Sequence, residues 1–130
     1  MRRKLLSIIL LSLFTLTSWT FDIYSDITNA IRSGDAKSVA VYFNKTVDLT
    51  VNDEEEVLSK IHAEQVLKEF FQKNQPKSFS LIHKGVSKEG SKYAIGNMVT
   101  SKGINYRTYF FVKQTGSKEL IQEIRFEKQK

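Results

Sequence analysis

Few residues of this sequence could carry out acid–base or nucleophilic chemistry. Its 130 residues include no cysteine and two histidines, His62 and His83. The lack of cysteine excludes disulfides, thiolate nucleophiles and thiolate metal ligands. The sequence has no phosphate-binding glycine loop, no zinc-ligand spacing and no nucleophile elbow. We therefore assign no catalytic residue and keep only His83 as a candidate base, whose alternative role is a satisfied side chain in the interior or at its rim.

The acidic run DEEE at residues 53–56 is a candidate for binding a hard cation, because such ions take oxygen ligands. The run lacks the glycine-punctuated spacing of a calcium-binding loop. We interpret it as a solvated turn or a short ribbon, and we predict no metal and no cofactor.

A group of polar side chains is predicted to face the inside of a sheet, where they could bind a small molecule. Asn97, Thr108 and Gln122 are expected to meet across three neighbouring strands. The further candidates are Tyr93 and Tyr106 on the same face and Tyr42 at the pocket mouth. A concave sheet with a few convergent polar groups is typical of a small-molecule site. The alternative is that these groups satisfy one another or contact water at the rim of the sheet.

These positions depend on strands predicted in the second half of the chain. From Ser78 onward the hydrophobic pattern has a period of two, which is typical of half-buried strands. The four predicted strands lie near residues 78–86, 91–101, 104–114 and 118–127. A two-residue loop at Lys102-Gly103 and a three-residue loop at residues 115–117 would place all the polar candidates of these strands on one mostly apolar face.

The same register gives the sheet an opposite face that carries Arg107, Tyr109 and Arg125, which are candidates for contact with a partner. For the strand at residues 78–86 the register is less constrained. Its hydrophobicity favours Phe79, Leu81 and His83 on the inner side.

Three helices are predicted before these strands. The first ends at Gly34, and Asp35 caps a second helix that runs to Phe43 and stops at Asn44. Val47, Leu49 and Val51 then form a strand, and Ser59 caps a third helix over residues 60–73, whose apolar face includes Ile61. The order helix, helix, strand, helix and four-stranded meander predicts an α+β fold, with a curved antiparallel sheet packed on the helices.

The first residues have the pattern of a secretory signal peptide. MRRK is basic, and the uncharged stretch that follows extends from Leu5 to Phe21. The alternative is an uncleaved membrane anchor, since seventeen uncharged residues are at the lower limit for crossing a bilayer. We therefore expect residues 1–20 to direct export and residues 22–130 to form one domain. That domain would be periplasmic or extracellular, or would be anchored to the inner membrane if cleavage fails.

Charge is distributed unevenly along this domain. Residues 22–71 hold five basic and ten acidic side chains, whereas residues 72–130 hold twelve basic and four acidic ones. An acidic half that attracts a basic half explains this pattern. The alternative is a basic surface that binds a polyanion or anionic lipid headgroups. Because the lysines are scattered rather than clustered, we predict no specific nucleic-acid binding.

The order of elements and several stretches of sequence resemble the nuclear transport factor 2-like superfamily, also called the cystatin-like cone. AEQVLKEFF, PKSFSLIHKG, SKYAIGNMVT, YRTYFF and LIQEIRFEK are most similar to a bacterial group of small exported proteins classed as a domain of unknown function. The resemblance covers residues 22–127. It implies a conical α+β fold with a pocket between sheet and helices, and frequent dimers through the outer sheet face. It leaves function open, because the superfamily includes isomerases, dehydratases, polyketide cyclases and non-catalytic binding modules.

Isomerases of this superfamily place an aspartate base in the pocket, and the dehydratases and cyclases use Asp or His pairs. The predicted inner faces of the last three strands carry no Asp or Glu, and Asp48 alternates with inward residues and so points outward. The favoured hypothesis is an exported, non-catalytic module. It would bind a small or amphipathic ligand in the cone or a partner on the outer face, including a second copy. The alternatives are an isomerase or dehydratase that uses His83, and weak binding to a polyanion or membrane surface.

Overall fold

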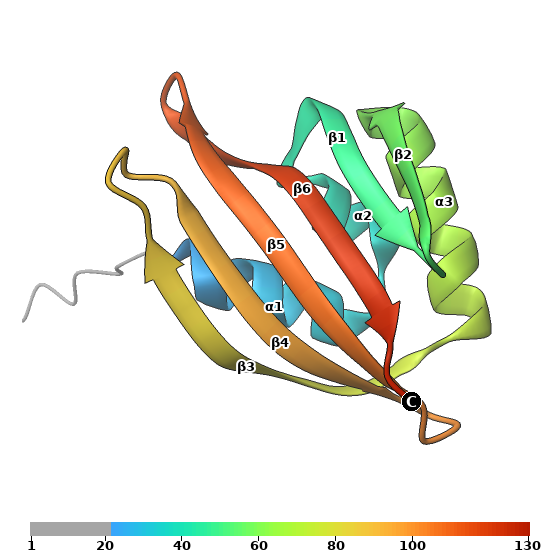
Figure 1. Ribbon diagram of the computed structural model, residues 1–130. Coiled ribbons are helices and arrows are strands. Elements are labelled where there is room, and N and C mark those ends of the chain that lie inside the picture. Colours follow the sequence, from blue (N-terminus) through green and yellow to red (C-terminus); the bar gives the residue numbers. More distant parts are fainter. Residues whose placement is uncertain (1–21) are drawn as a thin grey trace, which may run out of the picture.

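The computed structural model describes residues 22–130, so the signal peptide or anchor predicted for residues 1–20 lies outside the described part. The elements are α1 (Ile23–Ser33), α2 (Ala36–Ala40), β1 (Phe43–Val51), β2 (Glu54–Ser59), α3 (Lys60–Lys73), β3 (Pro76–Val86), β4 (Lys92–Thr100), β5 (Asn105–Thr115) and β6 (Lys118–Lys128). The strands form one sheet in the order β2-β1-β6-β5-β4-β3, in which only β1 and β6 run parallel. The sheet curves and the three helices lie on one side of it (Figure 1), which confirms the α+β cone.

None of the helices within residues 22–130 combines the length and the hydrophobicity needed to span a membrane.

The helix boundaries follow from capping, with one correction. Gly34 ends α1 in the left-handed conformation with a φ of 68°, and the Asp35 carboxylate accepts a hydrogen bond from the Lys37 backbone at the start of α2. The predicted extension of this helix to Phe43 is wrong, because α2 ends at Ala40 and β1 begins at Phe43. The Tyr42 carbonyl already accepts a hydrogen bond from the β6 backbone, so strand pairing replaces a marginal short helix.

The acidic run at residues 53–56, which was predicted to be a solvated turn or a short ribbon, forms the ribbon. Asn52 and Asp53 have φ values of 52° and 62° and connect β1 to β2 in a tight hairpin. Ser59 caps α3 through a hydrogen bond to the His62 backbone, as predicted. Ile61 is 67% exposed, so the expected apolar face of this helix does not include it.

The β4–β5 connection changes the predicted register by one residue. The loop contains three residues rather than two, because Thr100 and Ile104 close it: the Thr100 backbone N–H donates to the Ile104 carbonyl, and the Thr100 hydroxyl accepts from the Ile104 backbone N–H at 3.1 Å. Thr108 therefore faces Gly96, and Asn97 faces Arg107. A shift of one residue turns every side chain of β4 to the other side of the sheet.

The β5–β6 hairpin also differs from the prediction. Thr115 pairs with Lys118 across a two-residue loop, and a bulge occurs where Phe111 pairs with Glu123 but Val112 pairs with Ile121. Gln122 is the extra residue of this bulge. The bulge restores the predicted inward direction of the remaining apolar residues of β6, which are Ile124 and Phe126.

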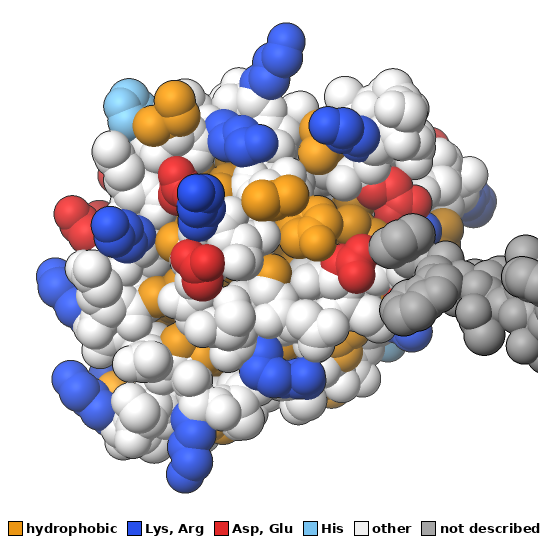
Figure 2. Space-filling model, turned by 180° about the vertical axis from the view of Figure 1, so that it is seen from behind, with side chains coloured by type: hydrophobic (Ala, Val, Ile, Leu, Met, Phe, Trp, Pro, Cys, Tyr) orange, Lys and Arg blue, Asp and Glu red, His pale blue; other side chains and the backbone are white. Residues whose placement is uncertain are grey.

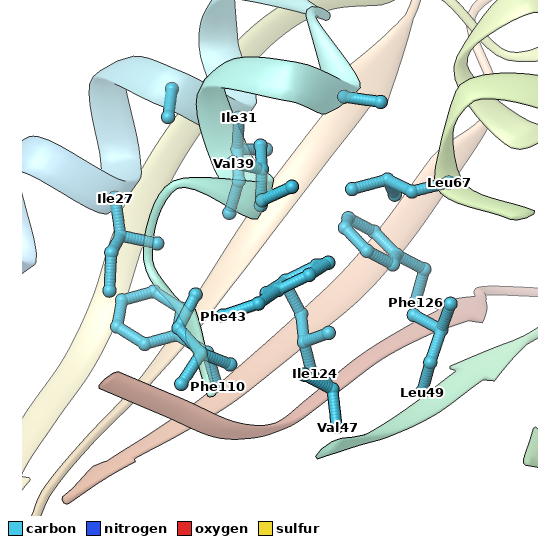
Figure 3. Packing of buried hydrophobic residues seen from close by; sticks show 14 of the residues in the cluster. Ile27, Ile31, Val39, Phe43, Val47, Leu49, Leu67, Phe110, Ile124 and Phe126 are labelled. Carbon is cyan, nitrogen blue, oxygen red and sulfur yellow. The ribbon is translucent and has the colours of Figure 1, made fainter. Parts of the chain in front are cut away.

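The inner side of the sheet is filled by side chains. Figure 3 shows residues of both the helices and the strands pointing into one cluster, which includes Ile27, Val39, Phe43, Leu67, Phe110 and Phe126. The Phe70 ring packs with its centroid 5.1 Å from the centroids of both Tyr106 and Phe126. These aromatic rings occupy the space in which the sequence had predicted a ligand pocket.

Candidate functional site

Two of the predicted pocket residues do face the interior, but they are packed within it. Tyr106 is buried and its hydroxyl donates a hydrogen bond to Asn74 Oδ1 at 3.1 Å. Burial raises the pKa of Tyr106. Thr108 is fully buried, and its hydroxyl has no hydrogen-bond partner among residues 22–130. Neither side chain is open to a ligand.

The expectation that Tyr93, Asn97 and Gln122 face the interior is wrong. Tyr93 and Asn97 lie on the outer side because the three-residue loop shifts β4 by one position. The Tyr93 ring covers Gly85, where an added Cβ would lie 2.5 Å from the tyrosine hydroxyl. Gln122 is half-buried at the bulge and accepts a hydrogen bond from the Asn44 side chain at 3.0 Å. The three polar groups therefore do not converge with Thr108.

The inward orientation predicted for His83 is also wrong. A register irregularity between Leu81 and His83 brings His83 opposite Ile95, on the outer side of the sheet. The imidazole is exposed, and its Nε2 lies 3.2 Å from the Tyr93 hydroxyl. A base at this position faces solvent and not an enclosed substrate, so the geometry gives the candidate no catalytic environment.

The outer face of the sheet combines these misplaced residues with those predicted to contact a partner. We use the name outer face for the outward side chains of β4, β5 and β6, which include Tyr93, Ile95, Asn97, Arg107, Tyr109, Phe111, Glu123, Arg125 and Glu127. No helix of residues 22–130 covers this side, which faces the viewer in Figure 1. The face is thus a sheet surface with partly exposed apolar side chains, and exposed apolar patches mark interaction sites.

The centre of the outer face is apolar. Tyr109 of β5 pairs with Ile95 on one side and with Arg125 on the other. Ile95, Tyr109 and Phe111 are each half-buried, although no helix of residues 22–130 lies on this side of the sheet. Neither Ile95 nor Phe111 was predicted to lie on this face, and the predicted register placed Ile95 in the interior.

Charged groups border this apolar centre. The Arg125 guanidinium lies 5.5 Å from the Tyr109 ring centroid and forms an ion pair with Glu123. The hydrogen bond with Glu123 raises the pKa of Arg125, and burial followed by the Glu123 charge raises the pKa of Tyr109. Arg107 is exposed on β5. This arrangement fixes Arg125 and leaves Arg107 free to meet a partner's carboxylate.

Acidic groups extend the border onto β1 and β2. Asp48 pairs with Glu123 along the β1–β6 ladder, and Glu55 lies on the neighbouring strand opposite Thr50. A side-chain hydrogen bond to Asp48 raises the pKa of Glu55. The β1 and β2 side of the outer face is therefore acidic, whereas Arg107 lies opposite Glu127 on the β5–β6 ladder.

Tyr42 lies away from this surface. It is half-buried between α2 and β1 and lines a hollow at the end of the cone where α1 begins. Burial and the nearby Asp26 charge raise the pKa of its phenol. Tyr42 is thus a predicted pocket residue that does line a surface hollow within residues 22–130.

Comparison with known proteins places this architecture in a family. A family model described as "Domain of unknown function (DUF4783)" matches residues 24–127, so the chain belongs to this family. A DUF4783 family protein from Bacteroides fragilis is 30% identical, with 83% of this chain and 100% of that chain covered and a TM-score of 0.75. A second one, from Bacteroides uniformis, is 26% identical, with 84% and 99% covered and a TM-score of 0.78.

A more distant neighbour shows the wider fold class. A domain of unknown function with a cystatin-like fold from Nostoc punctiforme is 10% identical, with 82% of this chain and 73% of that chain covered and a TM-score of 0.64. No curated protein matches this sequence. These similarities confirm the predicted bacterial family and the predicted cystatin-like fold.

The solved relatives also define the folding unit. The Bacteroides fragilis structure is covered along its whole length by 83% of this chain, and the buried cluster here is drawn from residues 23–126. One continuous buried cluster therefore spans the described residues, and the experiments below use residues 22–130.

Proposed function

We propose that this protein is an exported, non-catalytic interaction module that acts through the outer face of its sheet and associates there with a second copy of itself. The observation that carries this proposal is the set of half-buried apolar side chains, Ile95, Tyr109 and Phe111, on a sheet face that no element of residues 22–130 covers. Apolar sheet faces gain stability when they are removed from water.

A second copy fits this face because its charges are self-complementary. A two-fold axis through the apolar centre brings the same patch of both subunits together, so each charged border meets the opposite border of the partner. The acidic side formed by Asp48, Glu55 and Glu123 would then lie against Arg107 of the second copy. The resemblance to the nuclear transport factor 2-like superfamily, in which dimers through this face are frequent, supports the same arrangement.

The alternative hypotheses have less support. Proton-transfer catalysis would require a base that faces a bound substrate, whereas His83 is exposed on the outer side. A ligand in the interior would have to displace Phe70, Phe110 or Phe126, each of which is buried. Binding to a polyanion would require a cluster of basic groups, but the outer face carries both signs of charge.

Sedimentation velocity of residues 22–130 over a range of concentrations tests the proposal. We expect a concentration-dependent dimer that Tyr109→Glu abolishes, because the variant places a carboxylate in the apolar centre. Arg107→Glu tests the charge pairing with an exposed side chain that the fold does not need. The matched control is Ile61→Glu, which changes an exposed apolar residue on α3. A monomer at all concentrations, or equal behaviour of the Tyr109 and Ile61 variants, would contradict the proposal.

Export is a separate part of the proposal and rests on the basic and apolar pattern of residues 1–20. The full chain, expressed in a Gram-negative host, should be recovered outside the cytoplasm with its N-terminus after Ser18 or Thr20. Retention of residues 1–20 in the membrane fraction would instead establish the anchor. Recovery of the intact chain in the cytoplasm would refute export.

A further inference from the structure

A hollow of about 430 Å³ opens on the helix side of the molecule, away from the outer face. It lies where α1 begins, where α2 leads into β1, and where the β5–β6 hairpin turns. Its apolar wall consists of Ile23, Val41, Tyr42 and Leu120. Figure 2 shows hydrophobic side chains gathered in the middle of this side, with acidic and basic side chains around them. The volume is within the range of small-molecule sites.

A carboxylate borders this apolar wall. Asp26 lies in the first turn of α1, lines the hollow and is half-buried. Among residues 22–130 its side chain makes no hydrogen bond and no ion pair. Asp26 lies close enough to Tyr42 to add to the rise in the pKa of the phenol that burial causes. A half-buried carboxylate beside apolar surface is complementary to a cation that brings its own apolar part.

The other charged groups of the hollow are compensated or lie at its edge. Glu119 forms an ion pair with Lys92 at 2.9 Å. Lys118 is exposed at the β5–β6 turn. The side chain of Gln114 donates to the Gly116 carbonyl within the same hairpin. Two charges of the hollow are thus without an ion pair among residues 22–130, the exposed Lys118 at the turn and the half-buried Asp26 beside the apolar wall.

We propose that this hollow binds a small amphipathic amine. The apolar body of the ligand would pack on Ile23, Val41 and Leu120, and its protonated amine would bind the Asp26 carboxylate and the Tyr42 hydroxyl. Both oxygen groups accept hydrogen bonds, and an ammonium group has three donors to offer. The site shares no residue with the outer face as defined above, so its occupancy is tested separately from self-association.

Three probes with the same tail test the head group. Octylamine, octanol and octanoate, each below its micellar concentration, are titrated into residues 22–130 and followed by amide chemical shifts at Ile23, Tyr42 and Leu120. We expect octylamine to bind most tightly and octanoate least tightly. Burial of the tail alone would favour the uncharged octanol, so this ranking separates recognition of the amine from simple hydrophobic binding.

Variants connect the ranking to the residues. Asp26→Asn should weaken octylamine binding roughly fivefold, which corresponds to a half-exposed ion pair, and leave octanol unchanged. Leu120→Asp should weaken octanol and octanoate, since it removes part of the apolar wall. The control Glu69→Gln removes a carboxylate from the exposed side of α3 and should change nothing. Equal affinity for the three probes, no saturable binding, or an unchanged octylamine affinity in Asp26→Asn would overturn the proposal.

Discussion

Two buried threonines of the inner side provide a sharp test of the filled interior. Thr108 and Thr100 are 0% and 1% exposed, and their side chains differ in hydrogen bonding. The Thr100 hydroxyl accepts from the Ile104 backbone at 3.1 Å, whereas the Thr108 hydroxyl has no partner among the residues described. Replacement by valine keeps the shape of the side chain and removes only the hydroxyl group.

The two valine variants should therefore shift stability in opposite directions. An unsatisfied buried hydroxyl costs about 1–3 kcal/mol, so Thr108→Val should increase the free energy of unfolding by about 1–2 kcal/mol. Thr100→Val leaves the Ile104 N–H without its acceptor and should decrease it by about 1–2 kcal/mol. In a domain of this size each kcal/mol shifts Tm by roughly 4–8 °C.

Urea unfolding of residues 22–130, followed by circular dichroism, measures both changes. Tryptophan fluorescence is of no use for this domain, because the one tryptophan of the sequence is Trp19. A destabilised Thr108→Val variant would show that the hydroxyl has a partner in solution. That result would refute the account of a filled interior and would revive the predicted pocket around Thr108.

Three further changes test the contacts that hold the sheet. Tyr24→Phe removes the 2.7 Å hydrogen bond from the phenol to the Gly85 carbonyl. Amide exchange in β3 should therefore become faster, and the free energy of unfolding should fall by about 1 kcal/mol. Unchanged exchange would contradict the importance of this bond. Gly96→Ala places a Cβ 2.5 Å from the Phe79 ring of β3. This clash should lower the free energy of unfolding by about 1–3 kcal/mol and should lower Tm. An unchanged Tm in a thermal scan would show that the ring can move aside. The bond to Asp48 raises the pKa of Glu55, so the folded state favours the protonated carboxyl group. The stability that this bond adds to the folded state should therefore be lost as the pH rises above about 4.5. Glu55→Gln keeps a donor at every pH and should flatten this part of the stability–pH profile, whereas parallel profiles would contradict the assignment.

The sequence was sufficient for the elements that depend on local chemistry. Asp35 and Ser59 are side-chain caps that satisfy free backbone N–H groups, and Gly34 stops α1, so both helix starts and the first helix end were predicted correctly. The last four strands were predicted from the period-two pattern after Ser78, which is also a local signal. Each of these signals lies within a few residues of the feature that it specifies.

The features that were missed depend on contacts distant in the sequence or on single hydrogen bonds. The Thr100 hydroxyl stabilises a longer loop than the Lys102-Gly103 pair suggests, and this moved Tyr93 and Asn97 to the outer side. Tyr42 does not belong to α2, contrary to the prediction, because its carbonyl bonds to β6 where β1 pairs with that strand, which is far away in the chain. No glycine or other local signal marks the bulge at Gln122.

The candidate site was predictable only in part. Arg107, Tyr109 and Arg125 were correctly expected to lie on the outer side of the sheet, since the alternation in β5 and β6 was read in the right phase there. The apolar centre of that face was not recognised, because Ile95 looks like an interior residue until the loop length is known. The sequence contains no signal by which an uncovered apolar strand face can be told from a buried one.

Photo-crosslinking in the native compartment tests the central claim most directly. A benzophenone-bearing residue is placed at position 109 in the centre of the outer face, or at position 61 on the exposed side of α3 as the control. We predict that irradiation of cells yields an adduct with twice the mass of the chain from position 109 and none from position 61. Absence of any adduct from position 109, or equal adducts from both positions, would contradict the claim that this protein acts through the outer face of its sheet.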